Sequence, residues 1–420
     1  MTVSATLAIN EETAKRRAAG LPVVPLGFGE AGLPVHESLV HTLGEAAGQA
    51  SYGPVAGIAD LRDAAAGYWE RRGIPTSSER VIAGPGSKAL LYALLHASGG
   101  GVALPGPSWV SYAAQAALLR IRAELLPTLR GEGGAPDPHA LDAAATRCRR
   151  DGIPLTAVVL TLPDNPTGTV ATPETVRATC AVAERHDLLI ISDEIYRDLV
   201  HDQSTAYLSP AEVAPERTVV TTGLSKSLAL GGWRTGVARF PDGPRGTRLL
   251  EEVAAIASEI WSAPAHPVQC AAAWAFTEPE CLRERIQLSR QLHGRVARAV
   301  ADQLRALGAS VPSPTAGFYV YPDLEAHRDT LRSRHGIRTG PELATALLDG
   351  PGIATLPAAA FGEPPAALRL RMATSLLYGT THEEREQSLR SEDPTSLPWV
   401  ADHLTTLRTG MESLLDRGRR

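Results

Sequence analysis

The chain has 420 residues, of which 44% are hydrophobic and 21% charged, proportions that are ordinary for a globular protein. Its length predicts a large domain with a smaller one attached, because single cores stop growing at about 250–300 residues. The net charge of -5 is mild. It excludes a strongly basic nucleic-acid binder and gives no sign of an anionic membrane as partner.

The sequence also carries no sign of a membrane span, a secretory leader or a metal site. No apolar run approaches the roughly 20 residues that a spanning helix needs. The opening residues, MTVSATLAINEETAKRR, lack the apolar core of a signal peptide. The cysteines, Cys148, Cys180, Cys270 and Cys281, show no CxxC or metal-type spacing. We therefore expect a cytoplasmic protein with reduced thiols and no metal.

The first predicted elements are helices and an irregular arm. A helix is expected over 1–20. Residues 21–35 are rich in glycine and proline and predict an arm that runs over another part of the molecule. Apolar residues at helical spacing follow at 36–48 and 58–72. Residues 1–45 are predicted to form the arm and part of the smaller domain.

From about residue 80, short β-rich runs alternate with helical segments. The runs occupy 80–83 (RVIA), 101–104 (GVAL), 156–162 (TAVVLTL), 188–192 (LLIIS), 218–222 (TVVTT) and 235–240 (TGVARF). Helical segments separate most of them, at 85–97, 108–119, 173–186 and 247–260. This alternation predicts an α/β fold in which helices cover both faces of a mostly parallel sheet. We assign it to a large domain over 46–285.

Beyond about residue 280 the pattern changes again. A long charged helix is predicted over 280–307, and a strand-like run, VPSPTAGFYVYPDL, follows it. A further strand is predicted at 368–375 (LRLRMATS) and an amphipathic helix at 397–417. Together with the arm, residues 286–420 are predicted to form a smaller α+β domain.

Polar and glycine-rich sequences follow five of the predicted strands. They read GPGSK at 84–88, PGPSW at 105–109, PDNPTG at 163–168, DEIY at 193–196 and GLSK at 223–226. In an open parallel sheet, ligands bind beyond the carboxyl ends of the strands. We therefore expect these segments to line one crevice.

Part of this set suits the phosphate and ring face of pyridoxal 5′-phosphate (PLP). A phosphate is bound by backbone N–H groups at a helix start and by a cation. Gly86 lets the backbone approach, Ser87 adds a hydroxyl, and Arg234 supplies the charge. Trp109 can stack on the pyridine ring.

The remaining side chains suit the reactive end of the same cofactor. Asp193 can keep the pyridine nitrogen protonated, so that the ring accepts electrons. Asn165 and Tyr196 can donate hydrogen bonds to the ring oxygen. Lys226 can bind the aldehyde, because nearby cations lower the pKa of its amine.

Each motif also fits an ordinary structural role when taken alone. GPGSK and NPTG can be turns, DEIY can open a helix, and Trp109 can belong to a core. Lysine, however, occurs only at Lys15, Lys88 and Lys226. One of these three follows a predicted strand beside the other motifs, and this common order favours a cofactor site.

The stretch SKSLALGGWRTG, with DNPTG and SDEIY before it, resembles the class I/II aminotransferases, the fold-type-I PLP enzymes. The resemblance covers the chain from about residue 20 to the terminal helix. It implies that Lys226 holds the cofactor as a Schiff base and moves the substrate Cα proton, a catalytic role shared with Asp193 and Tyr196. It also implies that Ser225 and the backbone of Lys88 join the phosphate site.

The same resemblance implies a substrate site and a partner subunit. Tyr52 would reach the phosphate of the neighbouring subunit, which predicts a homodimer with shared active sites. Arg369 would bind the substrate α-carboxylate, with Arg371 as the neighbouring alternative. Gly29 would close over that carboxylate.

The sequence departs from the family pattern in three places. Gly223 stands where the family often has a phosphate-binding serine or threonine. Residues 376–396 are expected to be an insertion near the carboxylate site, and no role is assigned to them. The segment 259–269, which the resemblance places at the active site of the partner subunit, offers Glu259 and Trp261 but no arginine. This argues against an aspartate-type substrate and favours a cationic or polar one.

Transamination from an α-amino acid to a 2-oxo acid is the function that these features favour. The alternative is elimination or cyclisation of a β-hydroxylated amino acid, as in the capreomycidine-forming cyclases that act on 3-hydroxyarginine. A reaction that proceeds without an amino acceptor would favour the alternative. A non-catalytic PLP-fold regulator is a third hypothesis, against which the lysine and the lack of a DNA-binding motif both argue.

Overall fold

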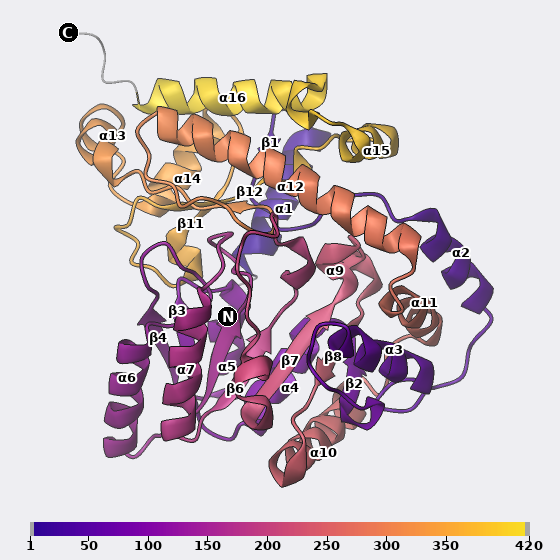
Figure 1. The fold of residues 1–420 in the computed structure, drawn as a ribbon. Helices are drawn as coiled ribbons and strands as arrows, with labels where there is room; N and C mark the ends of the chain where they lie inside the picture. The colour runs from indigo at the N-terminus through magenta and orange to yellow at the C-terminus, as the bar shows by residue number, and fades with distance from the viewer. Residues whose placement is uncertain (1–3, 416–420) are drawn as a thin grey trace.

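The computed structural model describes residues 4–415, and it has the predicted α/β fold (Figure 1). The main sheet has seven strands in the order β2-β8-β7-β6-β5-β3-β4. Strand β8 is antiparallel to both of its neighbours, and the other pairs are parallel. The strands are β2 (Val81–Gly84), β3 (Gly101–Gly106), β4 (Ala123–Pro127), β5 (Leu155–Thr161), β6 (Leu189–Asp193), β7 (Thr218–Gly223) and β8 (Gly236–Arg239).

Helices cover both faces of this sheet, which explains its unbroken apolar strands. Successive side chains of a strand point to opposite faces. On β5, Val159 packs in the layer that contains α4, α5 and α10, whereas Val158 packs in the layer that contains α6 and α7. A third cluster joins α3 and α11 to β2, β7 and β8. The helices are α3 (Ala59–Glu70), α4 (Ser87–Ala97), α5 (Val110–Leu119), α6 (Pro138–Arg150), α7 (Pro173–Arg185), α10 (Gly243–Ile260) and α11 (His266–Phe276).

The C-terminal part has its own core, and the N-terminal arm belongs to it. Its antiparallel sheet has the order β11-β12-β9, and β1 of the arm pairs with β10. Val24, Leu26 and Leu33 of the arm pack in the same cluster as α12, α13, α14 and α16. The elements are β1 (Val24–Pro25), β9 (Tyr319–Val320), β10 (Ile353–Ala354), β11 (Leu356–Pro357), β12 (Leu370–Ala373), α12 (Glu280–Ala306), α13 (Arg328–His335), α14 (Gly340–Asp349) and α16 (Pro398–Leu415).

The remaining helices connect or flank these two parts. They are α1 (Ala5–Ala18), α2 (Glu37–Ala46), α8 (Pro210–Val213), α9 (Leu224–Ser227) and α15 (His382–Arg390). The long helix α12 runs diagonally across the molecule in Figure 1 and continues through residue 285 without a break. The domain boundaries at residues 45 and 285 therefore stay predictions. The first predicted range, 1–45, and the last, 286–420, also include residues 1–3 and 416–420, which lie outside the described part.

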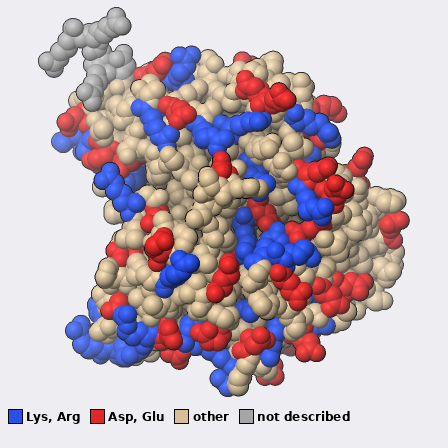
Figure 2. Space-filling view, viewed as in Figure 1, with Lys and Arg blue, Asp and Glu red and all other residues tan. Residues whose placement is uncertain are grey.

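The sequence patterns did not predict every element. Strand β4 and helices α6, α11, α13 and α14 are additions, and α15 forms within the segment 376–396 that we expected to be an insertion. Within residues 4–415, no helix combines the length and apolar character that crossing a bilayer requires. On the face shown in Figure 2, acidic and basic side chains are interspersed, as the mild net charge suggests.

Candidate active site

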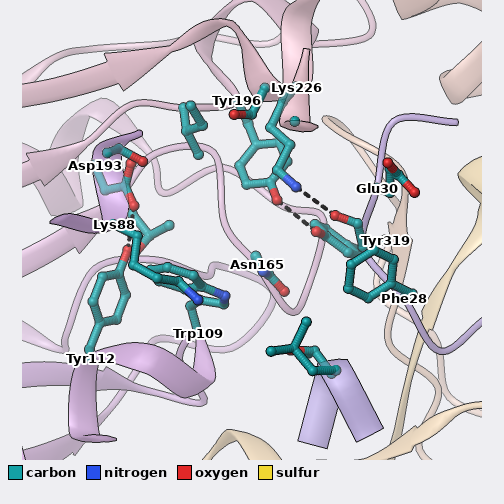
Figure 3. A pocket seen from close by; sticks show the side chains of 18 of the residues that line it. Phe28, Glu30, Lys88, Trp109, Tyr112, Asn165, Asp193, Tyr196, Lys226 and Tyr319 are labelled. Carbon is teal, nitrogen blue, oxygen red and sulfur yellow. Dashed lines mark hydrogen bonds between the residues drawn. The ribbon is translucent and has the colours of Figure 1, made fainter. Parts of the chain in front are cut away.

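A cavity of about 560 Å³ lies where the ends of β5, β6 and β7 meet the arm and the C-terminal part (Figure 3). The starts of α4 and α5 contribute to it, as do β12 and the first turn of α1. Ten of the predicted site residues line it: Gly29, Ser87, Lys88, Trp109, Asn165, Asp193, Tyr196, Ser225, Lys226 and Arg234. Gly86 borders it through Arg234.

Lys226 stands on α9, the short helix that directly follows β7. Its Nζ donates a hydrogen bond to the carbonyl oxygen of Gly29 in the arm, at 2.5 Å. Burial of the amine, reinforced by Arg371 and Arg234 and opposed by Glu30, lowers the pKa of Lys226 to about 8. A substantial neutral fraction is therefore available near neutral pH, and a neutral amine is the nucleophilic form.

Asp193 is the last residue of β6 and is buried, with 3% of its surface exposed. Tyr112 Oη donates a hydrogen bond to its Oδ2 at 2.8 Å, and Thr221 Oγ1 donates to its Oδ1 at 3.4 Å. Burial raises the pKa of Asp193 to about 6, although these hydrogen bonds lower it. Near neutral pH the carboxylate is available as the partner of a cationic ring nitrogen.

A pair of phenols and a buried amide lie on another side of the cavity. The hydroxyls of Tyr196 and Tyr319 are 2.6 Å apart and share a hydrogen bond. Asn165 is buried, and its Oδ1 has no hydrogen-bond partner among residues 4–415. Because Asn165 lines the cavity, this unpartnered oxygen leaves its amide available to a bound ligand.

The turn from β2 into α4 forms an anion site beside Arg234. Gly86 caps α4 with φ 87°, a left-handed conformation that favours glycine. A Cβ at this position would lie 2.4 Å from Arg234 Nη2. The first N–H groups of α4 and the guanidinium of Arg234 thus face the same end of the cavity, an arrangement that suits a phosphate.

Trp109 caps the start of α5 and lies against Tyr112, with ring centroids 5.3 Å apart in an edge-on contact. The ammonium of Lys88 lies 5.0 Å from the centre of the Trp109 ring. Burial and the nearby Arg234 lower the pKa of Lys88. The indole face and a cation therefore border the cavity together.

The structure corrects the prediction for the carboxylate arginine. Arg369 lies outside the cavity, where its Nε and Nη1 donate to Asp323 and Glu363, both at 2.8 Å. Two residues on, Arg371 lines the cavity with 1% of its surface exposed and donates to the Gly27 carbonyl. Arg369 is therefore neutralised by two carboxylates, whereas Arg371 has no carboxylate partner within residues 4–415.

Gly29 allows the arm to approach this arginine closely. A Cβ on Gly29 would lie 2.4 Å from Tyr319 Oη and 3.1 Å from Arg371 Nη1. Its position over Arg371 and Tyr319 agrees with the expectation that it closes over a bound carboxylate.

Some predicted residues do not reach the cavity of this chain. Tyr52 is 96% exposed and lies outside it. Glu259 and Trp261 do not line it either. A role for any of these residues in an active site requires a second copy of the chain.

Several lining residues were missed by the sequence motifs. They are Thr6, Leu7, Phe28, Glu30, Tyr112, Thr161 and Tyr319. Tyr112 could have been found, because it lies one helical turn after Trp109 in a helix that starts at a strand end. The residues of α1 and the arm are brought in by tertiary packing and carry no local signal.

Basic side chains outnumber acidic ones in the lining of the cavity, with Lys88, Lys226, Arg234 and Arg371 against Glu30 and Asp193. Among residues 4–415, none of Lys88, Lys226, Arg234 and Arg371 forms an ion pair with a carboxylate. Ligands that carry a phosphate and carboxylates would complete this charge balance. The sheet, the strand-end lysine and the cation-lined cavity together define a fold-type-I transferase.

Comparison with known proteins agrees with this class. The model of the family "Aminotransferase class I and II" matches residues 23–380. The chain is 33% identical to the aspartate/prephenate aminotransferase of Thermus thermophilus over 330 residues, which cover 77% of this chain and 82% of that one. It is 32% identical to the aspartate aminotransferase of Geobacillus stearothermophilus over 397 residues, covering 92% and 95% of the two chains.

A solved structure supports the fold as well. The aspartate aminotransferase from Thermus thermophilus with maleate superposes with a TM-score of 0.80 at 29% identity, covering 93% of this chain and 96% of that one. The chain belongs to the class I and II aminotransferase family, which confirms the resemblance seen in the sequence. It is an aminotransferase, and class I aminotransferases are PLP enzymes.

Proposed function

We propose that this chain transfers the amino group of an α-amino acid to a 2-oxo acid in the described cavity, with PLP bound through Lys226. The observation that carries the proposal is the placement of Lys226. Its amine lies at a strand end, has a pKa lowered to about 8, and shares one cavity with the carboxylate of Asp193. This is the pair of groups that a pyridine aldehyde requires.

The cavity has polar groups that fit each end of the cofactor. Ser87, Ser225, Arg234 and the N–H groups after Gly86 would hold the phosphate, because they combine donors with a cation. The partnerless Oδ1 of Asn165 shows that its amide has hydrogen bonds still to make. With the amide in its other orientation, the NH₂ group would donate to the ring oxygen.

Two further groups would fix the ring. Asp193 would pair with the pyridine nitrogen, held in orientation by Tyr112. The edge-on contact with Tyr112 sets the plane of Trp109, whose face would stack on the ring.

When bound, PLP accepts the substrate amino group and withdraws electrons from the substrate Cα. Lys226 would take the proton from Cα and later return one, because its amine is then free and largely deprotonated above about pH 8. Tyr196 would hold its proton toward the ring oxygen, since the hydrogen bond to Tyr319 orients its hydroxyl.

Arg371 would bind the substrate α-carboxylate. It is the buried arginine of the cavity, and its guanidinium lies 5.1 Å from the Tyr319 ring and 5.2 Å from the Phe361 ring. These rings hold the guanidinium plane while its outer N–H groups face the arm. A planar guanidinium binds a carboxylate through two parallel hydrogen bonds.

An acidic side chain is the substrate class to test first. The relatives named above are aspartate or aspartate/prephenate aminotransferases, and one was solved with maleate, a dicarboxylate. In this chain Lys88 offers a second cation next to Trp109, without a carboxylate partner in the described residues. The expectation from Glu259 concerns a second copy of the chain, so it stays an open alternative beside the cation that Lys88 provides.

We also propose a cytoplasmic homodimer with shared sites. Tyr52 supports it, because a phenol that is 96% exposed in one chain would be covered by a second copy. Large apolar side chains such as Ile260, 60% exposed, support an interface on the same grounds.

The test is a single half-reaction followed by absorbance. The holoenzyme mixed with aspartate and no 2-oxo acid should convert its bound cofactor once to the aminated form and release one equivalent of oxo acid. Lys226→Ala should lose the visible band of the lysine-bound cofactor. Turnover to a cyclised or deaminated product without an acceptor would instead support elimination or cyclisation, and an unchanged visible band in Lys226→Ala would overturn the proposal.

A further inference from the structure

The segment 376–396 has no role in the chemistry described above, yet it is built into the structure. It forms α15, which begins with a capping box between Thr381 and Glu384. Helix α15 packs on α12, and the turn at 394–396 packs on both α12 and α16. In Figure 1, α15 lies beside the start of α16.

The arm over 27–34 reaches the cavity as irregular backbone, and side chains from elsewhere hold its carbonyl oxygens. Arg371 donates to Gly27, and Lys226 donates to Gly29. Ser375 donates to Glu30. The arm thus depends on long-range hydrogen bonds, because it has almost no ladder of its own.

The last of these supports is Arg285 on α12. Its Nη2 donates to the Pro34 carbonyl at 2.6 Å, and its Nη1 donates to Glu386 Oε2 at 2.8 Å. Arg285 is 7% exposed. Removing the carboxylate partner of a guanidinium at this depth is strongly unfavourable, because it leaves a buried charge that was paired without its counter-charge.

Glu386 belongs to α15 and also contacts Arg390. This second contact provides a control for the experiment below, because it does not involve the arm. Its Oε1 accepts from Arg390 at 2.9 Å, and the side chain of Arg390 is 72% exposed. The contact with Arg390 is a surface ion pair, which contributes little. The contact with Arg285 connects α15 to the arm.

We infer that Glu386 and Arg285 are positioning residues, through which the segment 376–396 holds the arm against the cavity. The pair fixes Pro34, and with it the stretch that places the Gly29 carbonyl on Lys226 and Glu30 at the cavity wall. A substrate carboxylate between Arg371 and Gly29 would therefore meet a preformed wall. The effect on substrate binding rests on the proposed function, whereas the effect on the arm does not.

The test compares Glu386→Ala with Arg390→Ala in the full chain. Hydrogen–deuterium exchange of the holoenzyme should be faster at residues 26–35 in Glu386→Ala, because Arg285 loses its partner and releases the Pro34 carbonyl. The KM for the amino acid should rise roughly five-fold with kcat changed by less than about two-fold, the pattern expected when only binding is lost. Arg390→Ala should leave both measurements at wild-type values.

A graded variant guards against general misfolding. Glu386→Gln keeps an acceptor for Arg285 without the charge, so exchange in the arm should fall between wild type and Glu386→Ala. It also replaces Glu386→Ala if the alanine variant does not fold. Unchanged exchange at 26–35, or faster exchange spread evenly over the molecule, would overturn the inference. If exchange in the arm is faster but the wild-type enzyme fails the half-reaction test, the proposed function is refuted while the inference about the arm stands.

Discussion

Two arginines two positions apart have opposite environments in this structure. Arg369 and Arg371 are on the same side of an extended segment, so their spacing could not separate them. The neighbouring side chains distinguish the two arginines. Asp323 and Glu363 bind Arg369, whereas the rings of Tyr319 and Phe361 lie beside Arg371. The difference arises from packing against other segments of the chain, which explains why the motif alone could not show which arginine lines the cavity.

A matched pair of substitutions checks this assignment. Arg371→Lys should raise the KM for both the amino acid and the 2-oxo acid by about 10- to 100-fold, because lysine cannot bind a carboxylate through two parallel bonds. Arg369→Lys should change either KM by less than about three-fold, since its contacts are structural. Steady-state kinetics with both substrates give the comparison, and equal effects of the two variants would contradict it.

The residues that sequence could place are those that follow apolar strands directly. Lys226, Asp193, Asn165 and Tyr196 fall in the cavity because a parallel sheet brings its carboxyl ends together. Their chemical roles remain proposals. Tyr319 comes from the C-terminal sheet, and its approach to Tyr196 depends on how the two parts of the molecule pack, which no local pattern encodes.

At the scale of elements, the patterns found the buried strands of the main sheet and missed the one that is mostly exposed. The six strands that they found are almost wholly buried, and most contain short apolar runs. Strand β4 is an edge strand whose residues are mostly exposed, including Leu125 at 40%, so it lacks such a run. Helices α13 and α14 are short, and α13 is strongly polar, which weakens the apolar periodicity that would mark them.

The turn after β5 contains a buried acid with a measurable consequence. Asp164 is 2% exposed, and its Oδ2 accepts from the N–H and the hydroxyl of Thr167. Burial raises its pKa from 3.8 to about 7. Between about pH 4 and pH 7 the folded chain keeps a proton that the unfolded chain loses, so this group makes stability fall as the pH rises through that range.

Asp164→Asn should remove this pH dependence. Relative to wild type, the variant should gain stability from pH 4 to pH 7, by up to about 4 kcal/mol from a shift of this size. The difference should then stay constant above pH 7. Urea unfolding of both proteins at pH 5, 6 and 8 measures it, and a difference that does not vary with pH would show that Asp164 is not protonated in the fold.

At the scale of the whole molecule, the site of a single chain lacks the contribution predicted for Tyr52. A mixing experiment tests whether a second chain supplies it. Lys226→Ala and Tyr52→Ala chains, each of low activity, should together regain up to about a quarter of wild-type activity at limiting cofactor. Random exchange of subunits makes about half of the dimers mixed. Each mixed dimer has one intact site of its two, because Lys226 of one chain then meets Tyr52 of the other.

The control for that experiment places both changes in one chain. Lys226→Ala mixed with Lys226→Ala/Tyr52→Ala should regain nothing. Activity equal to the mean of the two separate variants, with no gain on mixing, would show that the sites are not shared.

The scarcity of lysine has a practical consequence for labelling. Lys88 and Lys226 lie in the cavity, and Lys15, which is exposed, lies on α1 about 13 Å along the helix axis from Thr6. Because Thr6 is a lining residue, an amine-reactive dye coupled to Lys15 would be attached to the helix whose first turn borders the cavity. The fluorescence of such a dye would report ligands entering the enzyme without any engineered cysteine.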